Sequence, residues 1–196
     1  MGPGIQPRYE FRAWAPELPE VKATLESASE CVQTLESTEI YLVTSEPTQA
    51  NPKVRRGALE VKLLLEVRDG FELWEPRVNE LFPVPDDVAA DVLFRWLEEP
   101  AFALPRDRYT LAELLDEVVA RCASVTAVEV TKVRRAYVVD GCLAEIADVT
   151  VAGTEMQTAA LESTEIPPLQ RACRALGVAD FTNTSYPTAI KQILQL

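Results

Sequence analysis

Two Asp-Gly dipeptides constrain the fold of this chain more than any other feature of its sequence. One, at 69–70, ends the alternating run 59–68, and the other, at 140–141, ends the alternating run 125–139. Asp-Gly suits the tight turns that join antiparallel strands, because glycine accepts the positive φ angle that these turns need. Both dipeptides therefore predict β-hairpins, and we expect an antiparallel sheet.

The spacing of apolar residues predicts the other elements, with period 2 for strands and period 3.6 for helices. Strands are expected at 8–14, 39–44, 53–55, 59–68, 71–74, 125–139, 142–152 and 156–163. Helices are expected at 17–29, at 86–98, after the capping box Thr110-x-x-Glu113, after Pro167-Pro168 and from Ser185. About eight strands in two groups of four, separated by helices, favour an α+β chain with a mostly antiparallel sheet or barrel.

Composition narrows the chemistry that such a domain can perform. The 196 residues are 47% hydrophobic and 26% charged, which fits one domain with a sizeable core. The chain has no histidine, so histidine-based nucleophile pairs, proton shuttles and metal sites are excluded. Four cysteines without a C-x-x-C motif are expected to be reduced and buried. No signal peptide or membrane-length apolar run is evident, so we expect a cytoplasmic protein that binds no membrane.

The net charge is strongly negative, at 19 − 31 = −12. Proteins that bind duplex nucleic acid normally carry a basic excess, so no duplex partner is expected. The acids concentrate at 15–50 and 80–117, mainly on predicted helices, which indicates a solvated acidic exterior. The segments 51–62 and 132–135 instead carry a basic excess on predicted strands.

The cations on these strands recur at every second residue, and residues i and i+2 share one face of a strand. Lys53 shares a face with Arg55, and Lys132 shares a face with Arg134. Such a row either faces solvent or lines a polar cavity. Polar faces of antiparallel sheets usually face water. A sheet closed on itself and covered outside by amphipathic helices would instead enclose the cations.

The order of these motifs resembles the CYTH, or triphosphate tunnel metalloenzyme, superfamily across roughly residues 8–163. The matching pieces are Arg8-Tyr9-Glu10-Phe11-Arg12, Lys53-Val54-Arg55, Leu59-Glu60-Val61-Lys62, Lys132-Val133-Arg134-Arg135, Ala144-Glu145-Ile146 and Ala160-Leu161-Glu162. The resemblance implies a single domain over 1–196 that forms an eight-stranded antiparallel β-tunnel with flanking α-helices. Residues 1–7 are expected to be a flexible N-terminus.

The resemblance also implies a metal-dependent phosphohydrolase that acts on an inorganic, organic or nucleoside triphosphate inside a basic tunnel. Mg²⁺ or Mn²⁺ would be the cofactor, because hard carboxylate oxygens suit these ions. The implied catalytic and metal-binding residues are Glu10, Glu145 and Glu162. The implied substrate-binding residues are Arg12, Lys53, Arg55, Lys62, Lys132 and Arg134.

Two positions depart from the pattern of this family, since Arg8 and Ala160 stand where carboxylates are expected. The loss of two acids leaves two other hypotheses open. The tunnel could bind a small phosphorylated or other anionic ligand without hydrolysing it. Alternatively, the chain could be an α+β domain whose cations form surface salt bridges, each contributing roughly 0–1 kcal/mol. The sequence does not set the oligomeric state.

Overall fold

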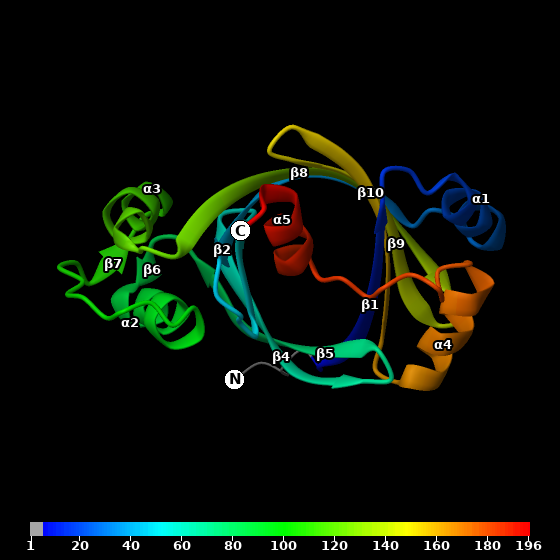
Figure 1. The fold of residues 1–196 in the computed structure, drawn as a ribbon, viewed down its shortest axis with the longest axis horizontal. Helices are drawn as coiled ribbons and strands as arrows, with labels where there is room; N and C mark the ends of the chain where they lie inside the picture. The colour runs from blue at the N-terminus through cyan, green and yellow to red at the C-terminus, as the bar shows by residue number, and fades with distance from the viewer. Residues whose placement is uncertain (1–5) are drawn as a thin grey trace.

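The computed structural model describes residues 6–196, and the predicted flexible segment 1–7 lies mostly outside them. Eight strands close into an antiparallel barrel in the order β1-β10-β9-β8-β2-β3-β4-β5 (Figure 1). Their bounds are β1 Arg8–Ala15, β2 Gln33–Thr44, β3 Ala50–Arg55, β4 Ala58–Arg68, β5 Phe71–Leu81, β8 Val125–Val139, β9 Cys142–Val151 and β10 Thr154–Ser163. The expected α+β fold with a closed eight-stranded barrel is confirmed.

Both Asp-Gly dipeptides form the predicted hairpin turns. Asp69 and Gly70 have φ angles of 53° and 81°, and Asp140 and Gly141 have 51° and 76°. The predicted grouping of four strands and four strands is wrong, because β1–β5 precede the helical insertion and β8–β10 follow it. β5 is the second arm of the 69–70 hairpin, so it pairs with β4 and belongs to the first group.

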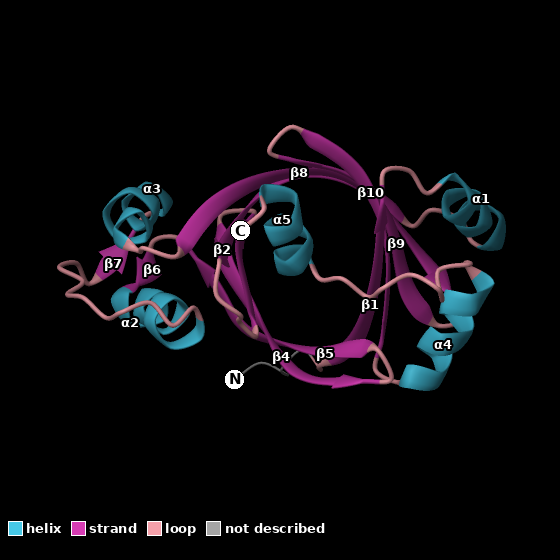
Figure 2. Ribbon diagram, in the orientation of Figure 1, coloured by secondary structure: helices cyan, strands magenta, loops and turns pink. Residues whose placement is uncertain are grey.

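Helices cover the barrel from outside in two places (Figure 2). On one side α1 and α4 pack against β1, β9 and β10, and their apolar contacts include Leu25, Leu169 and Phe11. On the other side the insertion between β5 and β8 packs against β3 and β4. The bounds are α1 Pro19–Ala28, β6 Val84–Pro85, α2 Asp86–Ala90, β7 Arg108–Tyr109, α3 Leu111–Glu113, α4 Ile166–Ala175 and α5 Tyr186–Leu194.

The two predicted helices of the insertion are present, and each continues as a wider π-helical turn. α2 continues over Asp91–Trp96, and α3 continues over Leu114–Val118. The predicted capping box is confirmed, since the Thr110 hydroxyl accepts a hydrogen bond from the Glu113 backbone at 3.3 Å. The Glu113 carboxylate in turn accepts one from the Thr110 backbone at 2.8 Å. No helix within 6–196 has the length and apolar character that crossing a membrane requires.

The last helix, α5, lies within the outline of the barrel (Figure 1). Tyr186 and Ile190 pack against inward-facing residues such as Tyr41, Val130 and Val149. These partners come from the C-terminal parts of β2 and β9 and the N-terminal part of β8, which meet at one end of an antiparallel barrel. α5 therefore fills one end of the barrel and leaves the other end for a cavity.

All four cysteines are unpaired, as expected. Cys142 and Cys173 are buried, and Cys122 is half-buried. Cys31 is exposed because it lies in the connection between α1 and β2, so the expectation of a buried thiol is wrong there.

Candidate functional site

A cavity of about 240 Å³ opens on the inner face of the barrel beside α5. It brings together all nine residues that the sequence predicts for the site. They are Glu10, Arg12, Lys53, Arg55, Lys62, Lys132, Arg134, Glu145 and Glu162. The cations therefore line an interior cavity and do not form a solvent-facing row, because the sheet closes on itself and helices cover its outer face.

Two groups of like-charged side chains lie on opposite sides of this cavity, although Lys62 on β4 pairs with Glu10 and Glu60 on β4 pairs with Arg55. Lys53, Arg55, Lys132 and Arg134, which we call the cation wall, lie on β3 and β8. Glu10, Glu72 and Glu162, which we call the acid wall, lie on β1, β5 and β10. In the barrel order, β8-β2-β3 stand opposite β5-β1-β10, so strand order alone separates the two walls.

The cation wall is built around Glu39, a residue of β2 that the sequence reasoning missed. Glu39 is 0% exposed, and its carboxylate lies 2.9 Å from Lys132 Nζ and 3.3 Å from Lys53 Nζ. Burial alone would raise the pKa of Glu39, but the positive charges of Lys53 and Lys132 hold that pKa well below its ordinary value. The prediction that the acids of 15–50 lie outside is therefore wrong for Glu39. The sequence offered one indication of this position. Glu39 shares a strand face with Tyr41, and Tyr41 pairs in register with Lys53 on the neighbouring strand.

Aromatic rings hold the deepest cation in place. Lys132 Nζ donates to the Tyr41 hydroxyl at 2.7 Å and lies 3.6 Å from the centre of the Tyr186 ring. The Tyr41 and Tyr186 rings stack at 5.3 Å, and Trp14 packs edge-on against Tyr186 at 4.9 Å. Burial lowers the pKa of Lys132 well below its ordinary value, and the charge of nearby Lys53 lowers it further. The first residue of α5 thus closes the cavity over the cation wall.

The three glutamates of the acid wall are neighbours across adjacent strands. Glu10 is paired in register with Glu162 on one side and with Glu72 on the other. Burial raises the pKa of Glu162, and the negative charge of Glu10 raises it further. Lys62 forms an ion pair with Glu10, and Arg8 lies 3.7 Å from Glu162. The acid wall therefore holds mutually repelling carboxylates that the protein neutralises only in part.

Glu145 lies between the two walls, on β9. Its carboxylate is 3.5 Å from Arg12 Nη1 and 3.7 Å from Arg134 Nη1. Ala160 is the cross-strand neighbour of both Glu145 and Arg12, and its small side chain leaves Arg12 room to reach Glu145. The ion pair between Arg12 and Glu145 therefore spans Ala160, the position where a carboxylate was expected.

The carboxylates of the cavity suit a divalent ion only if a bound ligand supplies further oxygen atoms. Within residues 6–196, no three acidic or cysteine side chains converge as a set of metal ligands. Mg²⁺ often takes one or two carboxylates and completes its shell with water and substrate phosphates. Glu10 and Glu162 could supply those carboxylates, because they face each other in register and burial and mutual repulsion raise the pKa of Glu162.

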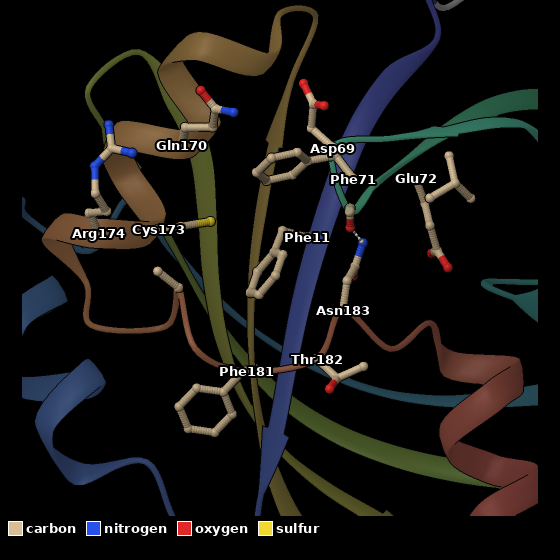
Figure 3. Close-up of a pocket in the computed structure, with 13 residues that line it drawn as sticks. Phe11, Asp69, Phe71, Glu72, Gln170, Cys173, Arg174, Phe181, Thr182 and Asn183 are labelled. Atoms are coloured by element: carbon tan, nitrogen blue, oxygen red, sulfur yellow. Dashed lines mark hydrogen bonds between the residues drawn. The ribbon is translucent and has the colours of Figure 1, made fainter.

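A larger cavity of about 600 Å³ lies outside the barrel, between α4 and the 69–70 turn (Figure 3). Phe11, Phe71 and Phe181 line it, and Arg174 is its one cation among the described residues. It shares Asn183 and Glu72 with the tunnel, but none of the nine predicted site residues lines it. With one cation and two acids, Asp69 and Glu72, in its lining, this cavity is a poor place for a polyanion.

Asn183, another residue that the sequence reasoning missed, ties the segment before α5 to the barrel. Its amide nitrogen donates to the carbonyls of Glu10 and Gly70, each at 3.0 Å, and its amide oxygen accepts from the Arg12 backbone at 2.8 Å. These bonds fix the position from which α5 enters the barrel. These contacts join residues more than 100 positions apart, so no local sequence pattern predicts them.

Neither a scan against protein-family models nor a search of curated proteins gave a match. Solved structures do match. A Hippeastrum protein, named as an adenylyl cyclase with a dominant triphosphatase activity, shares 14% identity over 96% of this chain and 97% of its own, with a TM-score of 0.53. A candidate adenylate cyclase from Bacillus halodurans shares 9% identity over 90% of this chain and 93% of its own, with a TM-score of 0.51.

A third similar structure is the PH1819 protein from Pyrococcus horikoshii, which shares 15% identity over 95% of this chain and 99% of its own, with a TM-score of 0.50. At such identities the likeness concerns the fold alone. The closed barrel, the order of its strands and these neighbours agree with the resemblance drawn from the sequence motifs. This chain therefore has the CYTH-type tunnel fold.

Proposed function

We propose that this chain is a phosphohydrolase that acts on a triphosphate-bearing small molecule held in the tunnel. The observation that carries the proposal is the opposition of the cation wall and the acid wall within one cavity. A triphosphate needs several convergent cations, which Lys53, Arg55 and Arg134 provide from two strands. Phosphoryl transfer depends on positioning and charge neutralisation more than on a protein nucleophile, so the absence of histidine is no obstacle.

The acid wall would serve the cofactor in this proposal. Glu10 and Glu162 would hold Mg²⁺ or Mn²⁺, which would neutralise negative charge on the bound phosphate oxygens. Glu145 would keep Arg12 and Arg134 directed at the ligand through its two ion pairs. The cation wall would hold the phosphate chain, and the ring of Tyr186 would keep water away from the buried Lys132.

A paired substitution on β8 tests this proposal. Arg134 lines the cavity, whereas the adjacent Arg135 bonds Asp148 at 3.0 Å on the other face of the same strand. Phosphate release from tripolyphosphate, ATP and thiamine triphosphate is measured with Mg²⁺ and with Mn²⁺. We expect Arg134→Gln to lower kcat/KM by about a hundredfold, and Arg135→Gln to leave it within about twofold. Equal activities in the two variants would refute a substrate site in the tunnel.

A second candidate function is binding without turnover, and the ion pairs of the acid wall favour it. Lys62 forms an ion pair with Glu10, and Arg8 lies near Glu162, so both carboxylates already have cationic partners. In that case tripolyphosphate would raise the melting temperature without phosphate release, and chelation of divalent ions would not weaken its binding. Loss of binding on chelation would instead support the metal-dependent reaction.

A further inference from the structure

The cation wall already contains an anion of its own. The Glu39 carboxylate lies within 4.0 Å of Lys53, Arg55, Lys132 and Arg134, which reach it from β3 and β8. Two further carboxylates reach the edge of this group, Glu60 at 2.7 Å from Arg55 and Glu145 at 3.7 Å from Arg134, so four positive charges meet three negative charges, 4 − 3 = +1. No other carboxylate among the described residues contacts so many cations of the cavity.

Glu39 is held firmly in this position. Tyr41 donates a hydrogen bond to Glu39 Oε2 at 3.1 Å while it accepts one from Lys132 Nζ at 2.7 Å, so the three side chains form a closed network. The contacts to Arg55 and Arg134 are longer, at 4.0 and 3.9 Å. Glu39 is therefore bonded to the deep part of the cation wall, and it only approaches the guanidinium groups that face the cavity.

We propose that Glu39 is a resident counter-anion, which stabilises the cation wall when the tunnel is empty and weakens the binding of the phosphate ligand. This inference rests on the proposed function of the tunnel as a polyphosphate site. Without Glu39, the four cations would repel one another, and a bound polyphosphate would relieve that repulsion. Glu39 therefore stabilises the ligand-free state more than the bound state, which allows a tightly charged site to release its ligand.

The linked effects on stability and on affinity have opposite signs. A neutral residue at position 39 raises the free energy of the empty protein, so the empty protein should melt at a lower temperature. The same residue removes a negative charge next to the phosphate chain, so the ligand should bind more tightly. A merely structural role for Glu39 would weaken both properties together, because a distorted cation wall binds phosphate poorly.

The test uses Glu39→Gln and tripolyphosphate, with Kd measured by calorimetry and melting temperature measured with and without the ligand. Relative to the unmodified chain, we expect Kd to fall by about tenfold and the ligand-free melting temperature to drop by roughly 4–8 °C. Glu36→Gln is the matched control, because Glu36 is exposed on the same strand and its substitution removes the same charge. Glu39→Asp retains the charge and should bind within about threefold of the unmodified chain.

The outcomes separate the two proposals. An unchanged or higher Kd in Glu39→Gln, with tight binding in the unmodified chain, would overturn the counter-anion and leave the tunnel site standing. Absence of tripolyphosphate binding in both proteins would overturn both proposals. If Glu39→Gln is unfolded without ligand, saturating tripolyphosphate should restore its folded circular dichroism spectrum. Failure to restore the folded spectrum would also refute the counter-anion.

Discussion

Glu162 shows, at the scale of a single residue, how a charge in the candidate site can reduce stability. Its carboxylate is half-buried on the acid wall, directly opposite Glu10, and desolvation together with this like charge raises its pKa above the ordinary value of 4.5. A carboxyl group whose pKa is raised in the folded state has no effect on stability where it is protonated in both states, and it costs stability as pH rises. At neutral pH the ionised Glu162 therefore costs stability, a cost that its role in the proposed function would explain.

The first prediction concerns Glu162→Gln. At pH 7 this variant should melt roughly 1–3 °C above the unmodified chain, because the substitution removes a half-buried negative charge beside Glu10. The gain should shrink as pH falls through the raised pKa, and it should vanish below about 4.5, where Glu162 is protonated in the folded and unfolded states alike. Calorimetric scans between about pH 4 and about pH 8 would measure the effect.

Glu155→Gln is the control for this prediction, because Glu155 lies exposed on the same strand. Its melting temperature should follow that of the unmodified chain at every pH. Under the proposed function, Glu162→Gln should also lower phosphate release by about a hundredfold. A lower melting temperature for Glu162→Gln at pH 7 would contradict the electrostatic account.

At the scale of an element, α5 determines which part of the barrel interior remains open. Its residues Tyr186 and Ile190 are buried against β2, β8 and β9 at one end of the barrel. Three hydrogen bonds hold the approach to this helix. Asn183 donates to carbonyls of β1 and of the 69–70 turn, and Trp14 Nε1 donates to the Thr184 carbonyl at 2.9 Å. The site therefore depends on a helix that is distant in sequence from most of the residues that form the cavity.

The second prediction concerns Ile190→Ala. Ile190 is 0% exposed, so truncation leaves a void between α5 and the barrel and should lower the free energy of unfolding by about 2–4 kcal/mol. Ile193→Ala, at a partly buried position of the same helix, should cost less than about half as much. Urea unfolding monitored by tryptophan fluorescence would measure both values. Equal costs would mean that Ile190 does not anchor the helix.

The third prediction tests the Tyr186 hydroxyl, which is buried and lacks a hydrogen-bond partner among the described residues. Tyr186→Phe removes this hydroxyl and keeps the ring over Lys132 and Arg12. Because an unsatisfied buried polar group costs about 1–3 kcal/mol, the variant should unfold at an equal or higher urea concentration. Tyr186→Leu, which lacks the ring face, should be less stable than Tyr186→Phe. A marked loss of stability in Tyr186→Phe would show that the hydroxyl has a partner.

At the scale of the whole molecule, the net charge of −12 and the basic tunnel are compatible because they occupy different surfaces. The acids of segments 15–50 and 80–117 are mostly exposed, with Glu39 and Glu99 as buried exceptions. The cations of the site are enclosed by the barrel. Under the proposed function a short phosphate chain would reach them, whereas a long duplex would meet a mainly acidic exterior.

The fourth prediction follows from this separation of charge. Tripolyphosphate should raise the melting temperature of the protein by an amount that grows with the logarithm of its concentration, as expected for a ligand that binds only the folded state. A DNA duplex at the same phosphate concentration should produce no shift, because it cannot enter the tunnel and the exterior repels it. A shift with the duplex would place a phosphate-binding surface outside the barrel.

The sequence predicts the strands and which site residues share a strand face, because both follow from local rules. Asp-Gly turns set the hairpins at 69–70 and 140–141, and the period-2 row of Lys132 and Arg134 sets which side chains share a face. The sequence does not reveal whether that face points inward, since polar rows on open sheets have the same spacing. Glu39 was missed for this reason. It lies in an acidic segment, and its sequence context does not distinguish it from the exposed acids around it.

The sequence by itself determined the antiparallel strands, the side chains on each strand face and the absence of histidine chemistry. Only the tertiary structure decided that the cation and acid walls stand opposite each other, that Glu39 lies within the cation wall, and that α5 fills one end of the barrel. The physical reason is the range of the forces involved. Turn geometry and strand periodicity act over a few residues, whereas barrel closure, ion pairing and tertiary hydrogen bonds join residues up to 173 positions apart.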